Sequence, residues 1–234
     1  MSNEHSAGLA VVTGATGGIG LAIVQHLLKA GWQVAGLDIG PTVARHDAYR
    51  HITVDLCDEA ATRRALDTLK DARALVHAAG ILRVGPLARM DPADGERMWK
   101  LHVDVAVRLA QILTPEMAAR GDGRVVLIGS RVAQGMPGRS QYAASKAALV
   151  ALARSWAAEL APQGVTVNVV SPAATQTAML DDPARAASAP RMPPIGRLIQ
   201  PEEIAALVQF LMSREAAAIT GQDIAICGGA SLPH

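Results

Sequence analysis

Tyr142 and Lys146 stand four residues apart in a stretch of good helix formers. This spacing places the phenol and the ammonium on one face of a helix, about one turn apart. A neighbouring lysine cation favours the phenolate, so it lowers the pKa of a tyrosine from its ordinary value of about 10 toward neutrality. Ser130, twelve residues before Tyr142, follows an apolar run and can donate a hydrogen bond to a substrate oxygen. These residues predict proton transfer at a hydroxyl or carbonyl oxygen, although a single Tyr-x-x-x-Lys pair also fits an ordinary surface helix.

A glycine-rich turn near the N-terminus predicts a site for a pyrophosphate. Residues 8–13 are an apolar run typical of a buried parallel strand, and Gly14, Gly18 and Gly20 follow directly. At such a turn, backbone N–H groups and the dipole of the next helix face an anion, and glycines permit its close approach. The spacing is Thr-Gly-x-x-x-Gly-x-Gly, not the Gly-x-Gly-x-x-Gly of other dinucleotide sites.

Strand and helix signals alternate along the chain, which predicts a doubly wound, Rossmann-type α/β fold of about seven parallel strands with helices on both faces. We expect strands near 8–13, 32–38, 51–55, 73–78, 124–129, 164–170 and 223–227, and helices near 18–30, 59–70, 94–120, 140–161 and 201–213. Pro115 is expected to bend the long helix, because proline lacks a backbone N–H. No linker divides the 234 residues, so we expect one domain over 1–234.

Composition argues against several kinds of partner. The 22 basic and 21 acidic residues are scattered and give a net charge of +1, so we expect neither nucleic acid nor a membrane surface as a partner. No signal peptide or long apolar segment is evident, which favours a cytoplasmic protein. Two distant cysteines, Cys57 and Cys227, fit a reducing compartment, and no histidine spacing suggests a metal site.

Asp38 ends the second expected strand, eighteen residues after Gly20. Its carboxylate can accept both hydroxyls of an adenosine ribose and would repel a 2′-phosphate. No Arg or Lys occupies the glycine turn or the two positions after Asp38. The sequence therefore predicts NAD rather than NADP as the cofactor, unless Asp38 only caps a turn.

Taken together, these motifs resemble the classical short-chain dehydrogenase/reductase family over residues 8–229. The resemblance implies a hydride-transferring enzyme in which Tyr142 is the general acid/base, Lys146 binds the nicotinamide ribose and Ser130 holds the substrate oxygen. It implies a homo-oligomer, most simply a tetramer, because family members pair the helix that carries the tyrosine across a two-fold axis. The cofactor contacts that follow from the resemblance and the motifs are Thr13, Gly14, Thr16, Gly18, Ile19, Gly20, Asp38, Asp55, Leu56, Ala78, Ala79, Gly80, Tyr142, Lys146, Pro172, Thr175 and Thr177.

The chain departs from the family pattern at several points. Counting back from Ser130 to the position of the family's catalytic asparagine gives His102. We expect His102 to take the asparagine's place in a proton relay from Lys146 to solvent, or else to be a core histidine bonded to a neighbouring carbonyl. His77-Ala-Ala-Gly80 stands where the family has Asn-Asn-Ala-Gly, and Ala173 replaces a glycine.

The substrate is the point that the motifs define least. Residues 178–198 are rich in proline and small residues, as expected of a lid over a ligand. Candidate substrate contacts are Arg131, Met136 and Met179, with Leu82, Val132 and Leu180 as further apolar candidates and Arg139, Arg185 and Arg191 as further basic ones. Each arginine also fits a solvated surface position.

Three functions remain in competition. The first, which we favour, is an NAD-dependent dehydrogenase of a small secondary alcohol, polyol or hydroxy acid. The second is a 3-oxoacyl-thioester reductase, which Asp38 disfavours because reductive biosynthesis usually draws on NADPH. The third is a non-catalytic NAD-binding protein, suggested by the altered residues at 102 and 173 but opposed by the intact Ser130, Tyr142 and Lys146.

Overall fold

Seven parallel strands form one sheet in the order β3-β2-β1-β4-β5-β6-β7. The computed structural model describes residues 7–42, 44–181 and 191–232. The strands are β1 (Leu9–Thr13), β2 (Gln33–Asp38), β3 (Tyr49–Thr53), β4 (Ala74–His77), β5 (Gly123–Ile128), β6 (Val165–Pro172) and β7 (Asp223–Ile226). The chain order reverses on either side of β1, so a crevice opens between the ends of β1 and β4, where an open parallel sheet binds its ligand. The predicted doubly wound fold is confirmed.

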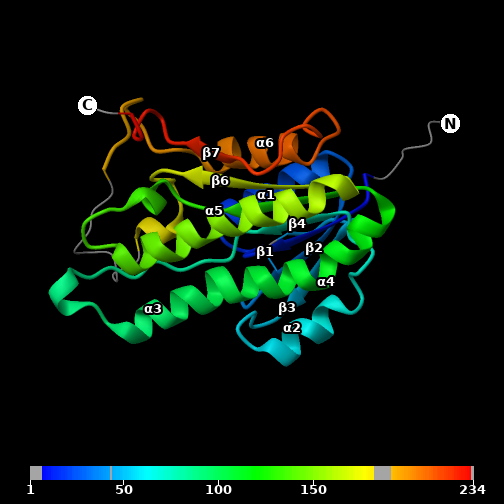
Figure 1. Cartoon of the computed structure of the whole chain (residues 1–234), viewed down its shortest axis with the longest axis horizontal. Helices are drawn as coiled ribbons and strands as arrows, with labels where there is room; N and C mark the ends of the chain where they lie inside the picture. Colours follow the sequence, from blue (N-terminus) through cyan, green and yellow to red (C-terminus); the bar gives the residue numbers. More distant parts are fainter. Residues whose placement is uncertain (1–6, 43, 182–190, 233–234) are drawn as a thin grey trace.

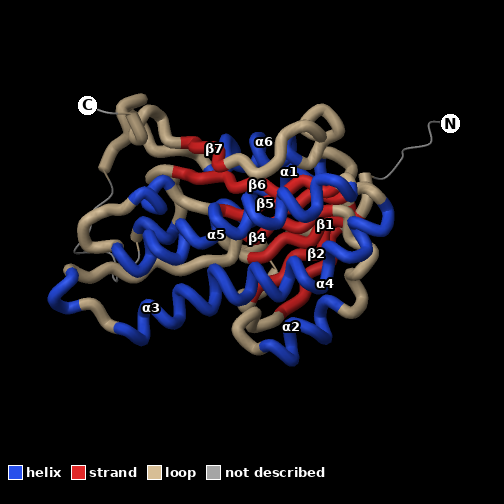
Figure 2. The backbone as a smooth tube through the Cα atoms, viewed as in Figure 1, coloured by secondary structure: helices blue, strands red, loops and turns tan. Residues whose placement is uncertain are grey.

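Helices cover both faces of this sheet, as Figures 1 and 2 show. They are α1 (Gly18–Lys29), α2 (Glu59–Leu66), α3 (Pro92–Trp99), α4 (Val105–Arg120), α5 (Ser140–Leu160) and α6 (Pro201–Leu211). Alternate strand residues serve opposite faces: Val11 packs into the core beneath α4 and α5, whereas Ala10 and Val12 pack beneath α1 and α6. Both cores are aliphatic, and they hold the strand ends in fixed positions.

The long helix expected over 94–120 is divided. A wide, π-helical turn over Lys100–Asp104 separates α3 from α4, and His102 lies at its centre, fully buried. Such turns often occur at functional sites because they free backbone groups from the regular ladder. The irregularity therefore lies near His102, while α4 continues through Pro115.

Two other boundaries differ from those expected. β3 begins and ends two residues earlier than predicted and places Asp55 just beyond the sheet; β3 is an edge strand whose mixed exposure gives a weak sequence pattern. α2 ends at Leu66 rather than near residue 70. Among the described residues, no helix is long and apolar enough to span a membrane.

Candidate active site

One cavity of about 860 Å³ runs along the carboxyl ends of the strands. Most of the predicted site residues line it: Gly14, Thr16, Gly18, Ile19, Gly20, Asp38, Asp55, Leu56, Ala78, Ala79, Gly80, Ser130, Arg131, Met136, Tyr142, Lys146, Pro172, Thr175, Thr177 and Met179. Thr13 and His102 are not in its wall. The further candidates Leu82, Val132, Leu180, Arg139 and Arg191 line it as well, whereas Arg185 lies outside the described residues.

The turn after β1 has glycines at the positions where a side chain would not fit, as a pyrophosphate site requires. Gly14 has φ +67°, and a Cβ there would lie 2.8 Å from the backbone nitrogen of Ala79. A Cβ on Gly20, at the start of α1, would overlap the carbonyl oxygen of Gly14. The backbone is thus packed too closely for any side chain at either position, and the first N–H groups of α1 face the cavity end of β1.

Thr13 supports this turn from beneath. Its hydroxyl oxygen accepts the N–H groups of Ala78 and Ala79 at 3.1 and 3.2 Å and lies 2.9 Å from Nδ1 of His77. Because both acceptor positions of the hydroxyl are used, its proton goes to Nδ1, and Nε2–H of His77 then donates to the Leu101 carbonyl at 3.1 Å. Burial lowers the pKa of His77 to about 3, so this ring is neutral.

Asp38 is fixed by two backbone donors. One carboxylate oxygen accepts from Gly40 N–H at 2.9 Å and the other from Thr16 N–H at 3.0 Å. Each carboxylate oxygen accepts more than one hydrogen bond, so two acceptor positions remain toward the cavity. Asp38 therefore caps its turn and also presents an oriented carboxylate to the cavity.

The end of β6 faces the glycine turn. A Cβ on Gly18 would overlap the methyl group of Thr177, so these two wall residues lie directly against each other. The Thr175 hydroxyl donates to the Ala173 carbonyl at 3.0 Å, and the Ala173 N–H donates to the Ile226 carbonyl at 3.0 Å. The alanine in the family's glycine position is thus accommodated within the strand's own hydrogen bonds.

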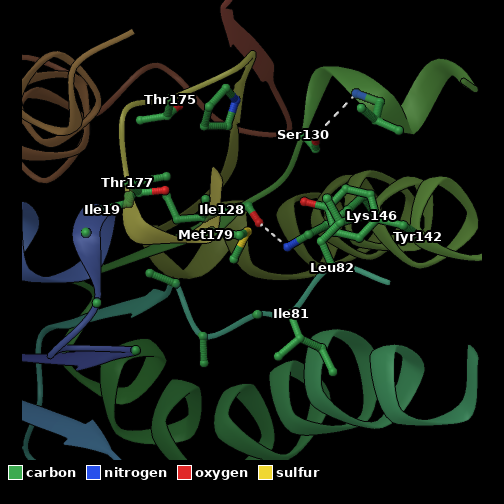
Figure 3. Close-up of a pocket in the computed structure, with 18 of the residues that line it drawn as sticks. Ile19, Ile81, Leu82, Ile128, Ser130, Tyr142, Lys146, Thr175, Thr177 and Met179 are labelled. Atoms are coloured by element: carbon green, nitrogen blue, oxygen red, sulfur yellow. Dashed lines mark hydrogen bonds between the residues drawn. The ribbon is translucent and has the colours of Figure 1, made fainter. Parts of the chain in front are cut away.

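Tyr142, Lys146 and Ser130 meet at the other end of the groove (Figure 3). Tyr142 and Lys146 project from the first turns of α5, and the Lys146 ammonium lies 5.8 Å from the centre of the Tyr142 ring. Ser130 ends the segment after β5 in an extended conformation, and its oxygen accepts from Val132 N–H at 3.2 Å. This bond uses the serine oxygen as an acceptor, so the hydroxyl proton can still be donated to a substrate oxygen.

Lys146 is buried and donates to the carbonyl of Ile128 at 2.8 Å, which fixes its position between β5 and α5. Burial lowers the pKa of Lys146 to about 7 because a charged ammonium loses its hydration. A lysine in this range exchanges its proton near neutral pH, a property that would suit a group beside a tyrosine acting as a general acid or base.

His102 connects the turn after β4 to the helix of Tyr142. Its Nε2 accepts from Ile81 N–H at 3.1 Å, and its Nδ1 lies 2.9 Å from the Ser145 hydroxyl. The Ser145 hydroxyl donates to the Tyr142 carbonyl at 2.9 Å, so Nδ1–H of His102 is the donor to Ser145. Burial and the charge on Lys146 lower the pKa of His102 well below its ordinary value, so the ring is neutral and both nitrogens are engaged.

Sequence reasoning missed His77 and Ser145, which hold the site without lining it. The signal for His77 was present, because His77 begins the segment in which both family asparagines are absent. Ser145 gave no signal, because a serine inside a predicted helix has no distinctive spacing. Among the described residues, no cluster of potential metal ligands occurs.

Comparison with known proteins gives consistent results. A family model described as enoyl-(acyl carrier protein) reductase matches residues 14–231. The 3-oxoacyl-[acyl-carrier-protein] reductase FabG of Vibrio cholerae is 34% identical over 235 residues, which cover 94% of this chain and 96% of the relative. A solved short chain dehydrogenase/reductase family protein has a TM-score of 0.88 at 33% identity, covering 96% of this chain and 97% of its own. A 3-ketoacyl-(acyl-carrier-protein) reductase from Brucella melitensis, solved with NADH, has a TM-score of 0.86 at 26% identity, covering 96% and 98%.

Proposed function

The chain belongs to the classical short-chain dehydrogenase/reductase family and is an oxidoreductase, and we propose that it transfers a hydride between NAD and a small secondary alcohol or the corresponding ketone. The observation that carries the choice of NAD is the oriented carboxylate of Asp38. The other carboxylate in the cavity wall, Asp55, lies at the same end, and none of the described residues in the wall there is basic. A 2′-phosphate would meet two carboxylates and no cation.

The chain's residues divide the chemistry among them. A bound nicotinamide supplies the hydride acceptor or donor. Tyr142 takes the proton from the carbinol oxygen in oxidation and returns it to the carbonyl oxygen in reduction, and Ser130 donates a hydrogen bond to that oxygen. Lys146, held by the Ile128 carbonyl, lowers the pKa of the phenol when charged and binds the nicotinamide ribose. His102 holds the wide turn and α5 together through Ser145, and its proposed further role is to take the place of the family's asparagine in a proton relay from Lys146.

A second candidate is a 3-oxoacyl-thioester reductase, which the likeness to the V. cholerae and B. melitensis reductases supports. The test is a scan of NADH formation across secondary alcohols, polyols, hydroxy acids and hydroxyacyl thioesters, repeated with NADP. Oxidation of the hydroxyacyl thioesters alone, and with NADP rather than NAD, would replace our proposal with the second candidate. If no substrate reduced either cofactor, the third possibility, a non-catalytic NAD-binding protein, would stand.

Replacement of Asp38 by Ala is expected to weaken NAD binding and to narrow the preference for NAD over NADP. The loss of a bidentate contact to the ribose costs about 2–3 kcal/mol, on the order of 10²-fold in Kd. Asp38→Asn is the matched control: it keeps one accepting oxygen for the backbone donors but removes the charge, so it should narrow the preference with less effect on thermal stability. Fluorescence titration with both cofactors measures the effect. A wild-type protein that already used NADP as well as NAD would contradict the assignment.

We also expect a homotetramer. The outward face of α5 carries small residues, among them the exposed Ala144, Ala147 and Ala151, which leave a flat surface suited to a second helix. Light scattering at micromolar concentration should give about four times the mass of one 24.3 kDa chain. A monomer mass would defeat this expectation.

A further inference from the structure

The two ends of the cavity carry opposite charge. Its wall contains two carboxylates, Asp38, the last residue of β2, and Asp55, two residues after β3. Strands β1 and β4 lie between β2 and β5, so at about 4.8 Å per strand the ends of β2 and β3 lie about 14 Å and 19 Å from the end of β5, near Ser130. All other charged side chains of the described wall are basic: Arg131, Arg139, Arg191 and Lys146, of which Arg131 follows Ser130 directly and Arg139 and Lys146 flank Tyr142 in the chain.

Arg139 is the central residue of this basic end. Only 8% of its surface is exposed, and it belongs to the cavity wall. It immediately precedes α5, three residues before Tyr142, so its backbone lies about 5 Å from that of Tyr142 along the helix axis. Burial at this position argues against the solvated-surface interpretation of its guanidinium.

Arg131 is the second arginine of this basic end. It follows Ser130 directly and begins the short helix over Arg131–Gln134. Arg131 is thus next to Ser130 in the chain, and Arg139 is three residues before Tyr142, so each arginine is attached close to one of the two residues proposed to hold the substrate oxygen. Apolar residues, including Leu82, Met136 and Met179, form the remainder of this part of the wall.

We propose that the substrate carries a carboxylate within a few bonds of the reacting carbon, and that Arg139, assisted by Arg131, binds it. This inference rests on the proposed function and narrows its substrate class from secondary alcohols to hydroxy acids and their oxo acids. Arginine suits the role because its planar fork of donors binds a carboxylate in two places and thereby orients the carbinol. An acyl thioester lacks such a charge, because its pantetheine arm separates the nearest phosphate from the reacting carbon.

The test compares substrates that differ only in charge. Initial rates with NAD are measured for 2-hydroxybutyrate, 3-hydroxybutyrate and the methyl ester of each, with wild type, Arg139→Gln, Arg139→Lys and Arg131→Gln. Arg64→Gln is the control, since it removes one exposed positive charge from α2, outside the cavity wall. The side chain of Arg139 makes no cap hydrogen bond to α5.

We expect wild type to prefer one of the acids over its ester and Arg139→Gln to lose on the order of 10²-fold in kcat/KM for the acid. Turnover of the ester should change little, Arg139→Lys should retain part of the preference, Arg131→Gln should lose less than Arg139→Gln, and Arg64→Gln should behave as wild type. Equal use of acid and ester by the wild type would overturn the proposal while leaving the proposed function in place. An equal loss for both in Arg139→Gln would also overturn it.

Two further arms separate the remaining outcomes. The first arm compares a coenzyme A thioester, which carries phosphates, with its N-acetylcysteamine counterpart, which carries none. If only turnover of the coenzyme A thioester depended on Arg139, the anion would be a phosphate and the assignment to a carboxylate would be overturned. If no substrate were turned over, the proposed function would fail; calorimetry with malonate in the presence of NAD would then decide the anion site. Binding that Arg139→Gln abolished would support the site, and no binding to wild type would overturn it.

Discussion

The Tyr142→Phe variant is expected to lose turnover by on the order of 10⁴-fold, the upper end of what a positioned acid–base group contributes. The substitution removes the oxygen that exchanges the proton and leaves the aromatic ring, which packs edge-on at 5.6 Å from the ring of His102. The hydrogen bonds of Lys146 to Ile128 and of Ser145 to the Tyr142 backbone carbonyl do not involve the phenol. NADH affinity should therefore be nearly unchanged.

Single-turnover rates and NADH fluorescence titration measure the two quantities separately. The chain provides a matched control in Tyr49, its second tyrosine, which lies on β3 and contacts His51 at 3.3 Å outside the cavity wall. Tyr49→Phe should turn over substrate as wild type does. If Tyr142→Phe retained a tenth of the activity, the proton transfer would have to be assigned to another residue.

The fold was predictable because its signals are local. Each central strand is a short apolar run with a turn at its carboxyl end, and the order of strand and helix leaves few possible topologies. The boundary of β3 was less predictable, because an edge strand lacks the continuous burial that marks a central one. The wide turn over Lys100–Asp104 was not predictable from helical periodicity, since the residues on both sides favour an ordinary helix.

The residues of the cavity wall were predictable for a related reason: parallel strands all end at the same edge of the sheet, so residues after the strands must meet there. The supporting residues were not. His77 bonds to Thr13 and to Leu101, 64 and 24 residues away, and Ser145 bonds to His102, 43 residues away, and no spacing rule connects such partners. The position of Asp38 was also hidden, because the sequence does not show that a carboxylate bonded to two backbone N–H groups can line the cavity as well.

His102 stands where counting back from Ser130 places the family's catalytic asparagine. Its ring holds the Ile81 N–H on one side and the Ser145 hydroxyl on the other. A Cβ on Gly80 would lie 3.1 Å from His102 Nε2 and 3.6 Å from the Lys146 ammonium, so both groups approach the same point. For the ring to pass a proton, one of its two hydrogen bonds must exchange. If the proton relay instead used a backbone carbonyl of the wide turn, no hydrogen bond of the ring would have to exchange.

We expect His102→Leu to lose on the order of 10²-fold in turnover with NAD affinity preserved, and His102→Asn to retain most of the activity. Leucine leaves the Ile81 N–H and the Ser145 hydroxyl without the imidazole, at a cost of about 1–3 kcal/mol for each buried group, so the urea midpoint should also fall. Asparagine again offers one acceptor and one donor from a shorter side chain. The comparison of the two variants therefore separates the loss of hydrogen bonds from the loss of a ring.

The pH dependence of turnover distinguishes how His102 acts. A buried histidine that is neutral when folded contributes stability above its unfolded pKa of about 6.5, and this contribution is lost as the pH falls toward the lower folded value. His102→Asn should thus remove part of the acid sensitivity of folding whatever the role in turnover. If the ring passes protons, the same variant should also alter the profile of kcat against pH; if only the turn matters, that profile should match wild type. Full activity in a folded His102→Leu protein would assign the residue to structure alone. The same assignment would follow if His102→Leu simply unfolded and His102→Asn were inactive.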